Sequence, residues 1–232
     1  SNLQAVVNNG GTGFANNNYT WASGNIEVNI TQGEITLDGQ GKVIIDAKKQ
    51  SRIFNIGSGA TVTLKGITFI NGNANGNGGS ILSDGKLTLE NCNFINNTAS
   101  DNGGAVFFGP VEGDTITNCV FENNIAGING GAIDFARGTS TDFYSGSSKA
   151  TISNSKFNNN IANRSGGAVY WFGTYGTIKN SNFTNNKALG LIEVPDSYGV
   201  PDYGGYGGAI MWTGANGIIT NSRFISNEAE YN

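Results

Sequence analysis

The chain has 232 residues, a net charge of -4, 36 glycines and no histidine. The lack of histidine removes the commonest general base and metal ligand, and an acidic chain without a basic run is a poor partner for nucleic acid or an anionic membrane. No apolar run reaches the roughly 18 residues of a membrane helix, and no signal-peptide pattern is found, so we expect a processed piece of a larger protein.

Residues 1–24 are predicted to form an N-terminal cap. Leu3, Val6 and Val7 follow the i, i+3, i+4 spacing of a short amphipathic helix, which would cover the open end of a repeat structure. From Asn25 the chain changes to short alternating runs, such as N-I-E-V-N-I and T-V-T-L, that are bounded by Gly, Asn or Lys. These runs predict strands of about four to six residues joined by turns.

One motif then recurs along the chain. Residues 91–106 read N-C-N-F-I-N-N-T-A-S-D-N-G-G-A-V. Variants of this motif, the last one truncated, begin at Asn118, Asn154, Asn180 and Asn221. A period of about 26 residues is typical of a solenoid, in which each unit buries its apolar residues by stacking on its neighbours. With three short strands per period, we predict one all-β domain over 1–232, a parallel β-helix of roughly six to seven coils.

Alignment of the copies predicts two inward columns, one aliphatic and one of phenylalanine, whose neighbours along each strand face water. The phenylalanines are Phe69, Phe94, Phe121, Phe157, Phe183 and Phe224. An asparagine lies three residues after most of them, where its amide can bond the same amide one coil away. These asparagines are Asn97, Asn124, Asn160, Asn186 and Asn227.

Two corners are also predicted from the alignment. Asparagine tolerates left-handed backbone, which suits the corner before each phenylalanine strand at Asn91, Asn118, Asn154, Asn180 and Asn221. Glycine pairs are expected where the chain approaches itself too closely for a Cβ atom, at 78/79, 103/104, 130/131, 166/167 and 207/208. Cys92 and Cys119 share an inward column, and because parallel side chains make a disulfide torsion awkward, free buried thiols are favoured over a bridge.

The paired signatures G-G-A-[IV] and F-x-x-N resemble those of the polymorphic outer-membrane protein (Pmp) repeats. The Asn-rich sequence is similar to adhesin-like surface proteins of methanogenic archaea. The segments that carry this similarity are S-R-I-F-N-I, A-T-V-T-L-K-G-I-T-F-I-N-G and G-G-A-V-Y-W. The resemblance covers roughly residues 34–232 and implies a right-handed parallel β-helix, displayed on a cell surface, with a role in adhesion. Gly72 and Ser80 depart from the repeat pattern and suggest an imperfect coil near the N-terminus. The last copy stops before a glycine pair, so we expect the natural protein to continue.

Two insertions interrupt the period, and both flank the third strand of a coil. One lies near 137–149 after G-G-A-I-D-F, and the other lies near 189–206 before G-G-A-I-M-W. Insertions in repeat proteins often form the binding side, so we expect a groove on the outward side of this strand, walled by the two loops. The outward positions, called the third-strand face below, are Leu82, Phe107, Asp134, Tyr170 and Met211. The alternative is that the loops fold over this face and cover it.

Aromatic rings anchor protein partners at low entropic cost and present flat apolar surfaces to sugars, so they lead the set of candidate binding residues. The set is Phe107, Asp134, Tyr170 and Met211 on the face, with Phe143, Tyr144, Tyr198 and Tyr203 in the insertions. The predicted function is an extracellular, monomeric adhesin domain of the cell surface that binds a glycan or protein of another cell.

Two other functions remain open. A passive stalk has no reason to break its period twice beside one strand. A polysaccharide hydrolase or lyase needs paired carboxylates or a clustered acidic calcium site, and the acids of this chain are scattered. Asp134 and Arg137 are the closest acid and base on the face, most simply an exposed ion pair. Glu193, Asp196 and Asp202 match no ordered calcium-ligand spacing, so no metal, cofactor or catalytic residue is expected.

Overall fold

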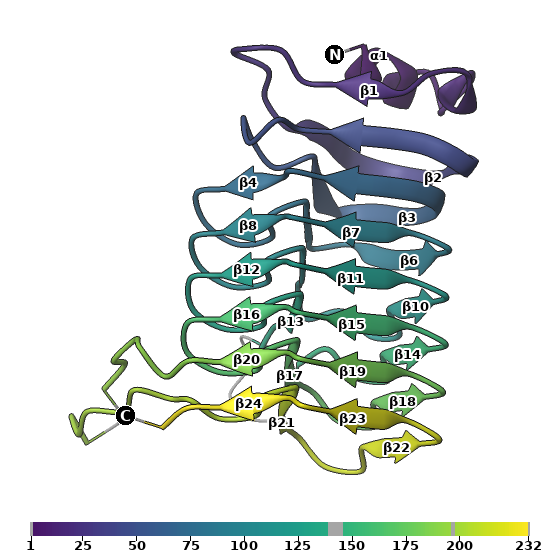
Figure 1. Cartoon of the computed structure of the whole chain (residues 1–232). Helices are drawn as coiled ribbons and strands as arrows, with labels where there is room; N and C mark the ends of the chain where they lie inside the picture. Colours follow the sequence, from purple (N-terminus) through teal and green to yellow (C-terminus); the bar gives the residue numbers. More distant parts are fainter. Residues whose placement is uncertain (1, 139–145, 196–197, 232) are drawn as a thin grey trace.

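The computed structural model describes residues 2–138, 146–195 and 198–231, which form a tall stack of coils with a short helix at the N-terminal end (Figure 1). Helix α1 (Leu3–Asn8) buries Leu3 and Val7 against the stack. The cap is completed by a 3-10 turn, η1 (Phe14–Asn16), and by strand β1 (Tyr19–Thr20), where the rings of Phe14 and Tyr19 stack with centroids 5.4 Å apart. The predicted N-terminal helix is therefore confirmed.

Two long strands follow the cap and bend around several sides of the stack. They are β2 (Val28–Asp46) and β3 (Phe54–Ile70), which pair in parallel along most of their length. Successive parts of β3 then pair with three separate short strands of the next coil. Beyond β3, glycine and left-handed asparagine at the corners divide each coil into separate short strands.

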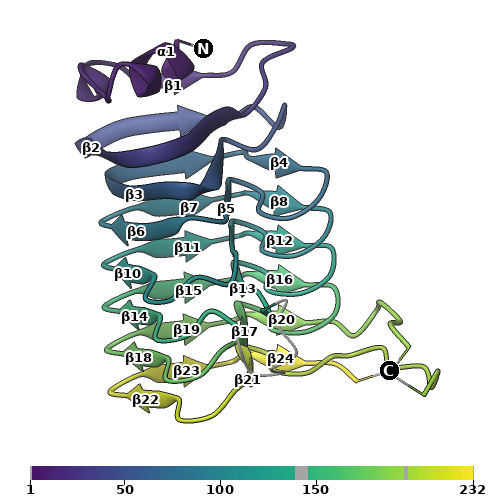
Figure 2. The ribbon, with the colours of Figure 1, turned by 180° about the vertical axis from the view of Figure 1, so that it is seen from behind.

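The short strands form four columns, which Figure 2 shows from behind. The first column holds β6 (Lys86–Glu90), β10 (Thr115–Thr117), β14 (Thr151–Ser153), β18 (Thr177–Lys179) and β22 (Ile218–Thr220). The phenylalanine column holds β7 (Asn93–Ile95), β11 (Val120–Glu122), β15 (Lys156–Asn158), β19 (Asn182–Thr184) and β23 (Arg223–Ile225). A column of two-residue strands holds β4 (Asn73–Ala74), β8 (Thr98–Ala99), β12 (Ile125–Ala126), β16 (Ile161–Ala162), β20 (Lys187–Ala188) and β24 (Glu228–Ala229). The third-strand column holds β5 (Ile81–Ser83), β9 (Val106–Phe108), β13 (Ile133–Phe135), β17 (Val169–Phe172) and β21 (Ile210–Thr213).

The named strands of the described residues pair in parallel, within an 18-stranded sheet and a 6-stranded sheet. The register joins equivalent residues of successive copies, so that Phe121 pairs with Phe94 on one side and with Phe157 on the other. This pairing confirms the parallel β-helix. Each complete coil has three strand positions of three or more residues, as predicted, together with a two-residue strand that joins the smaller sheet.

The phenylalanine column is a continuous stack of rings inside the coils. Phe94, Phe121 and Phe157 are fully buried, and successive rings lie 4.8 Å apart and tilt by only 3°. At the C-terminal end, Phe224 still stacks on Phe183 but is 45% exposed. The core is therefore a packed column of aromatic and aliphatic side chains whose last layer faces solvent.

Beside this stack runs a buried ladder of asparagine amides with a fixed direction. Asn124 Nδ2 donates to Asn160 Oδ1 at 2.9 Å and to the Phe94 carbonyl at 3.0 Å, and the Asn124 backbone N–H also donates to Asn160 Oδ1. The same pattern joins Asn97 to Asn124, Asn160 to Asn186 and Asn186 to Asn227. Along the ladder, each amide oxygen thus accepts from the asparagine of the preceding coil, and each amide nitrogen donates to the asparagine of the next.

The departures from the repeat at Gly72 and Ser80 meet where this ladder ends. Asn97 Oδ1 has no asparagine donor on its N-terminal side, and it accepts instead from the Gly72 N–H at 2.8 Å and from the Ser80 hydroxyl at 2.6 Å. The Ser80 hydroxyl therefore replaces the missing amide donor, and the terminal acceptor stays satisfied inside the core.

The corners also follow the prediction. The asparagines before the phenylalanine strands have φ between 46° and 53°, in the left-handed region. At the glycine corner, Gly103 has φ of 71°, and a Cβ on Gly104 would collide with the backbone of Gly131 and Ile125 in the next coil. Cys92 and Cys119 are buried free thiols, as favoured from the sequence.

Candidate binding face

The third-strand face is a straight column of side chains in register. Parallel pairing places Leu82 beside Phe107, then Asp134, Tyr170 and Met211 in successive coils. Strand alternation sends the neighbouring residues Val106, Ile133 and Val169 into the core, where they are fully buried. The five predicted face residues are therefore brought together in one column.

Asp134 is the most enclosed member of the face. Phe107, Tyr170 and Met211 are half-buried, but Asp134 is only 5% exposed, and burial raises the pKa of its carboxyl well above the ordinary value. The prediction of an exposed ion pair with Arg137 is wrong, because the Asp134 side chain is enclosed in the column. The Arg137 guanidinium carbon lies 5.8 Å from the centre of the Phe172 ring. The Asp134 carboxyl is therefore harder to ionise than an exposed one.

Tyr170 connects the face to the second insertion through Arg164. The Tyr170 hydroxyl lies near the Arg164 side chain, and Arg164 Nη2 donates to Asp202 Oδ2 at 2.9 Å. Burial raises the pKa of Tyr170, the nearby Asp134 carboxyl adds to the rise, and Arg164 acts to lower this pKa. The Arg164 side chain is 12% exposed, and its Nε has no hydrogen-bond partner within the described ranges. A buried cation therefore joins two parts of the candidate site.

The second insertion, residues 189–206, leaves the corner between β20 and β21, and its outer part projects away from the coils (Figures 1 and 2). Two hydrogen bonds fix its base to the preceding coil. The Leu191 N–H donates to the Asn163 carbonyl, and the Gly205 N–H donates to the Arg164 carbonyl. Tyr198 lies on the projecting part and is 91% exposed. Tyr203 is also exposed, and its hydroxyl hydrogen bonds with Glu193, which raises the pKa of Tyr203.

The first insertion is described only at its two ends. Arg137 and Gly146 form an antiparallel bridge that closes its base, and the buried Ser147 hydroxyl donates to the Gly109 carbonyl at 3.1 Å. Phe143 and Tyr144, which the sequence places in the binding set, lie outside the described residues. Their role stays a prediction.

Sequence reasoning missed the part played by Arg164 and by its partner Asp202. Asp202 was considered only as a calcium ligand, whereas its carboxylate pairs with Arg164 and accepts from the Tyr206 hydroxyl at 3.1 Å. The available signal was an arginine two residues before the glycine pair at 166/167, where the other copies have no cation. Within the described ranges, no group of three or more His, Cys, Asp or Glu side chains is placed to hold a metal ion.

A separate hollow of about 400 Å³ lies at the opposite end of the stack, between α1 and β2. Its walls combine Val7, Ile30 and Ile35 with polar side chains such as Asn29 and Glu34. None of the predicted binding residues contributes to it, so it is not the predicted groove.

Comparison with protein families identified the repeats. The model described as the Chlamydia polymorphic membrane protein (Chlamydia_PMP) repeat matches residues 91–109, 118–136 and 154–170. The chain carries Pmp-type repeats. Each matched segment runs from the left-handed asparagine through the phenylalanine strand and the glycine corner to the third strand. No curated protein and no solved structure matches the chain.

The Pmp-type repeats suggest a surface protein of the adhesin-like kind, in agreement with the resemblance seen in the sequence. The archaeal context of that resemblance stays a prediction. No helix among the described residues has the length and apolar character needed to cross a membrane.

Proposed function

We propose that the chain is an adhesin domain displayed outside the cell, which binds a glycan or protein of another cell through the third-strand face. The observation that supports this proposal most is that Tyr170 on the face lies near the half-buried guanidinium of Arg164, which pairs with Asp202 in the second insertion. A passive spacer would not require an arginine that fixes an insertion beside one strand. The Pmp-type repeats support a surface location.

The chemistry of the face supports recognition. Phe107, Tyr170 and Met211 offer half-buried rings and apolar surface, and the enclosed Asp134 carboxyl lies between them in the column. Binding sites usually combine apolar surface with a few placed polar groups, which fix the orientation of the ligand. The proposed partner therefore presents an apolar patch that packs against these rings.

A polysaccharide-active enzyme is the weaker proposal. Burial raises the pKa of the Asp134 carboxyl, as a general acid requires, but glycoside hydrolysis also needs a second carboxylate. Asp202 also acts on the pKa of Tyr170, but its carboxylate is paired with Arg164. We therefore propose a binding role without catalysis, and no cofactor.

The test compares binding of the monomeric domain to a glycan array and to whole cells. Tyr170→Ala should lower binding by about tenfold. The control Tyr175→Ala removes an exposed tyrosine that is not part of the third-strand face, and it should leave binding unchanged. A shortened loop in which Gly and Ser replace residues 192–201 keeps Asp202 on Arg164 and should weaken binding while melting stays nearly unchanged. If these variants remain folded and bind as the parent does, the stalk function replaces the adhesin.

A further inference from the structure

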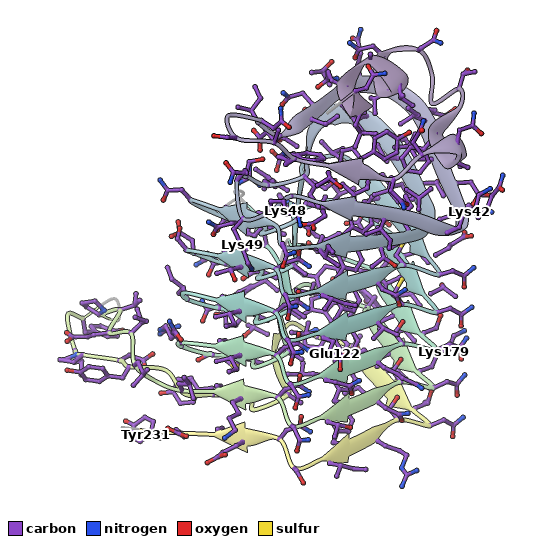
Figure 3. All side chains as sticks on the ribbon, turned by 45° about the horizontal axis from the view of Figure 1, so that its top comes forward. Lys42, Lys48, Lys49, Glu122, Lys179 and Tyr231 are labelled. Carbon is purple, nitrogen blue, oxygen red and sulfur yellow. The ribbon has the colours of Figure 1, made fainter. Side chains whose placement is uncertain are left out.

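The outer part of the second insertion gathers exposed apolar side chains in one place. We call this set the loop tip, and it consists of Leu191, Val194, Tyr198, Val200 and Tyr203. On the described coils between the cap and the last coil, exposed residues of this kind stand singly, as Ile125 and Tyr175 do. Single apolar residues on a surface are ordinary, but a cluster indicates an interaction site. In Figure 3 the side chains of this loop stand clear of the stack.

The tip is held by a rigid base. Asp202 pairs with the buried Arg164, accepts from Gly204 N–H and the Tyr206 hydroxyl through Oδ1, and accepts from Val194 N–H through its carbonyl. The backbone is closely packed there as well, because a Cβ on Gly205 would clash with the Glu230 carbonyl. Fixing a loop before binding reduces the entropy lost on association. These contacts fix the two sides of the loop from which the apolar cluster projects.

The charge of the insertion narrows the class of partner. Residues 189–206 contain Glu193, Asp196 and Asp202 and have no lysine or arginine. Arg164 neutralises Asp202, so the outer part of the loop retains acidic charge next to its apolar side chains. An anionic membrane surface would repel this loop, whereas a protein with basic groups around an apolar site would attract it.

The shape and the residue types also favour a protein over a sugar. Sugar sites are concave and rely on placed polar groups, whereas this tip is convex and three of its five residues are the aliphatic Leu191, Val194 and Val200. A projecting loop with an aromatic anchor is suited to a concave site on another protein, as long binding loops of small antibody domains are.

We propose that the loop tip inserts into an apolar cleft with a basic rim on a protein of another cell. This inference rests on the proposed adhesin function and assigns the partner class to the second insertion, with Tyr198 as the central anchor. The third-strand face lies at the base of the insertion and supplies the surrounding contacts.

The experiment uses two matched triple variants of the complete domain. The tip variant carries Val194→Ser, Tyr198→Ser and Val200→Ser. The control variant carries Ile44→Ser, Ile125→Ser and Tyr175→Ser, which also removes two exposed aliphatic residues and one exposed tyrosine, away from the loop. Binding is measured by flow cytometry on a panel of animal, bacterial and archaeal cells, each untreated, protease-treated or glycosidase-treated, and on zwitterionic phosphatidylcholine vesicles.

The expected result is a loss of about tenfold or more for the tip variant, with the control variant within about twofold of the parent. Protease treatment of the cells should abolish binding, and glycosidase treatment should not. Glu193→Lys should weaken binding by about threefold and reduce its salt dependence, because the partner's rim is basic. Each variant is checked for β-sheet circular dichroism and cooperative melting.

The outcomes separate this inference from the proposed function. If Tyr170→Ala weakens binding but the tip variant binds as the parent does, the tip inference is wrong and the adhesin function stands. Loss of binding after glycosidase treatment, or equal binding to vesicles, assigns the tip to a glycan or a lipid and overturns the protein partner. A parent that binds no cell in the panel overturns both proposals.

Discussion

Replacing Phe121 by alanine tests whether the ring stack stabilises the fold. Phe121 is fully buried and lies between Phe94 and Phe157, with both ring centroids 4.8 Å away. Truncation of a buried phenylalanine costs about 3 to 5 kcal/mol through lost transfer energy and the cavity that remains. Two stacked contacts, worth about 0.5 to 1.5 kcal/mol each, place the expected loss in the upper half of that range.

Phe224→Ala is the matched control at the end of the same column. Its ring is 45% exposed and stacks on one neighbour, Phe183, with centroids 4.9 Å apart. The exposed part of the ring gains little from burial, and removal leaves no closed cavity, so the expected loss is roughly 1 to 2 kcal/mol.

The assay is urea unfolding followed by two probes, β-sheet circular dichroism and the fluorescence of Trp171 and Trp212, which stack in the C-terminal half. Solenoids can unfold in parts, so the free energy of unfolding is calculated only where the two transitions coincide. Equal losses for Phe121→Ala and Phe224→Ala would refute the inference that stacking on both sides, within a closed core, stabilises the coils.

Three further predictions concern polar groups. Asn124→Ala should cost about 3 kcal/mol or more in the same urea titration, because it leaves the Asn97 amide and the Phe94 carbonyl without their hydrogen-bond partner inside the core. The control Asn123→Ala changes an exposed corner residue and should cost about 1 kcal/mol. Burial raises the pKa of the Asp114 carboxyl from 3.8 to about 7, so the contribution of this group to stability should be fully present below pH 4, fall by up to about 4 kcal/mol between pH 4 and 7, and then level off. Asp114→Asn keeps the acceptor for the Leu87 N–H and should reduce the fall in melting temperature between pH 4 and 7, leaving the part that is due to Asp134, and a slope unchanged by the variant would contradict the assignment. EDTA should leave the melting temperature unchanged, and a drop that calcium reverses would contradict the prediction that no metal is needed.

The scaffold was predictable from sequence because each structural role recurs as the same residue type. Phe121 or Asn124 alone says little, but a residue repeated at one position in every copy identifies a column, and a column fixes the register of the strands. The end of the ladder was not predictable in this way. Ser80 and Gly72 looked like defects in the pattern, and only their common contact with Asn97 explains them.

The candidate site was predictable in position but not in chemistry. Alternation along the strands placed Asp134 and Tyr170 correctly on the outward side, yet it could not indicate that Asp134 is enclosed. Period-two reasoning assigns a side of the sheet, whereas burial depends on everything that covers that side. The contact between Arg164 and Asp202 spans 38 residues and depends on the path of an insertion without repeat symmetry, so no alignment of copies contains it.

The direction of the asparagine ladder bears on how such a gene can change. Every internal amide bonds its two neighbours in the same sense, from Asn97 to Asn227. Duplication or loss of one whole copy would therefore return each amide to an equivalent partner, and recombination between copies would yield a foldable chain of another length. The coil that contains Ser80 cannot be exchanged in this way, because its serine hydroxyl can only end the ladder at Asn97 and cannot continue it. Unequal crossover should thus vary the middle of these proteins and preserve their N-terminal coils.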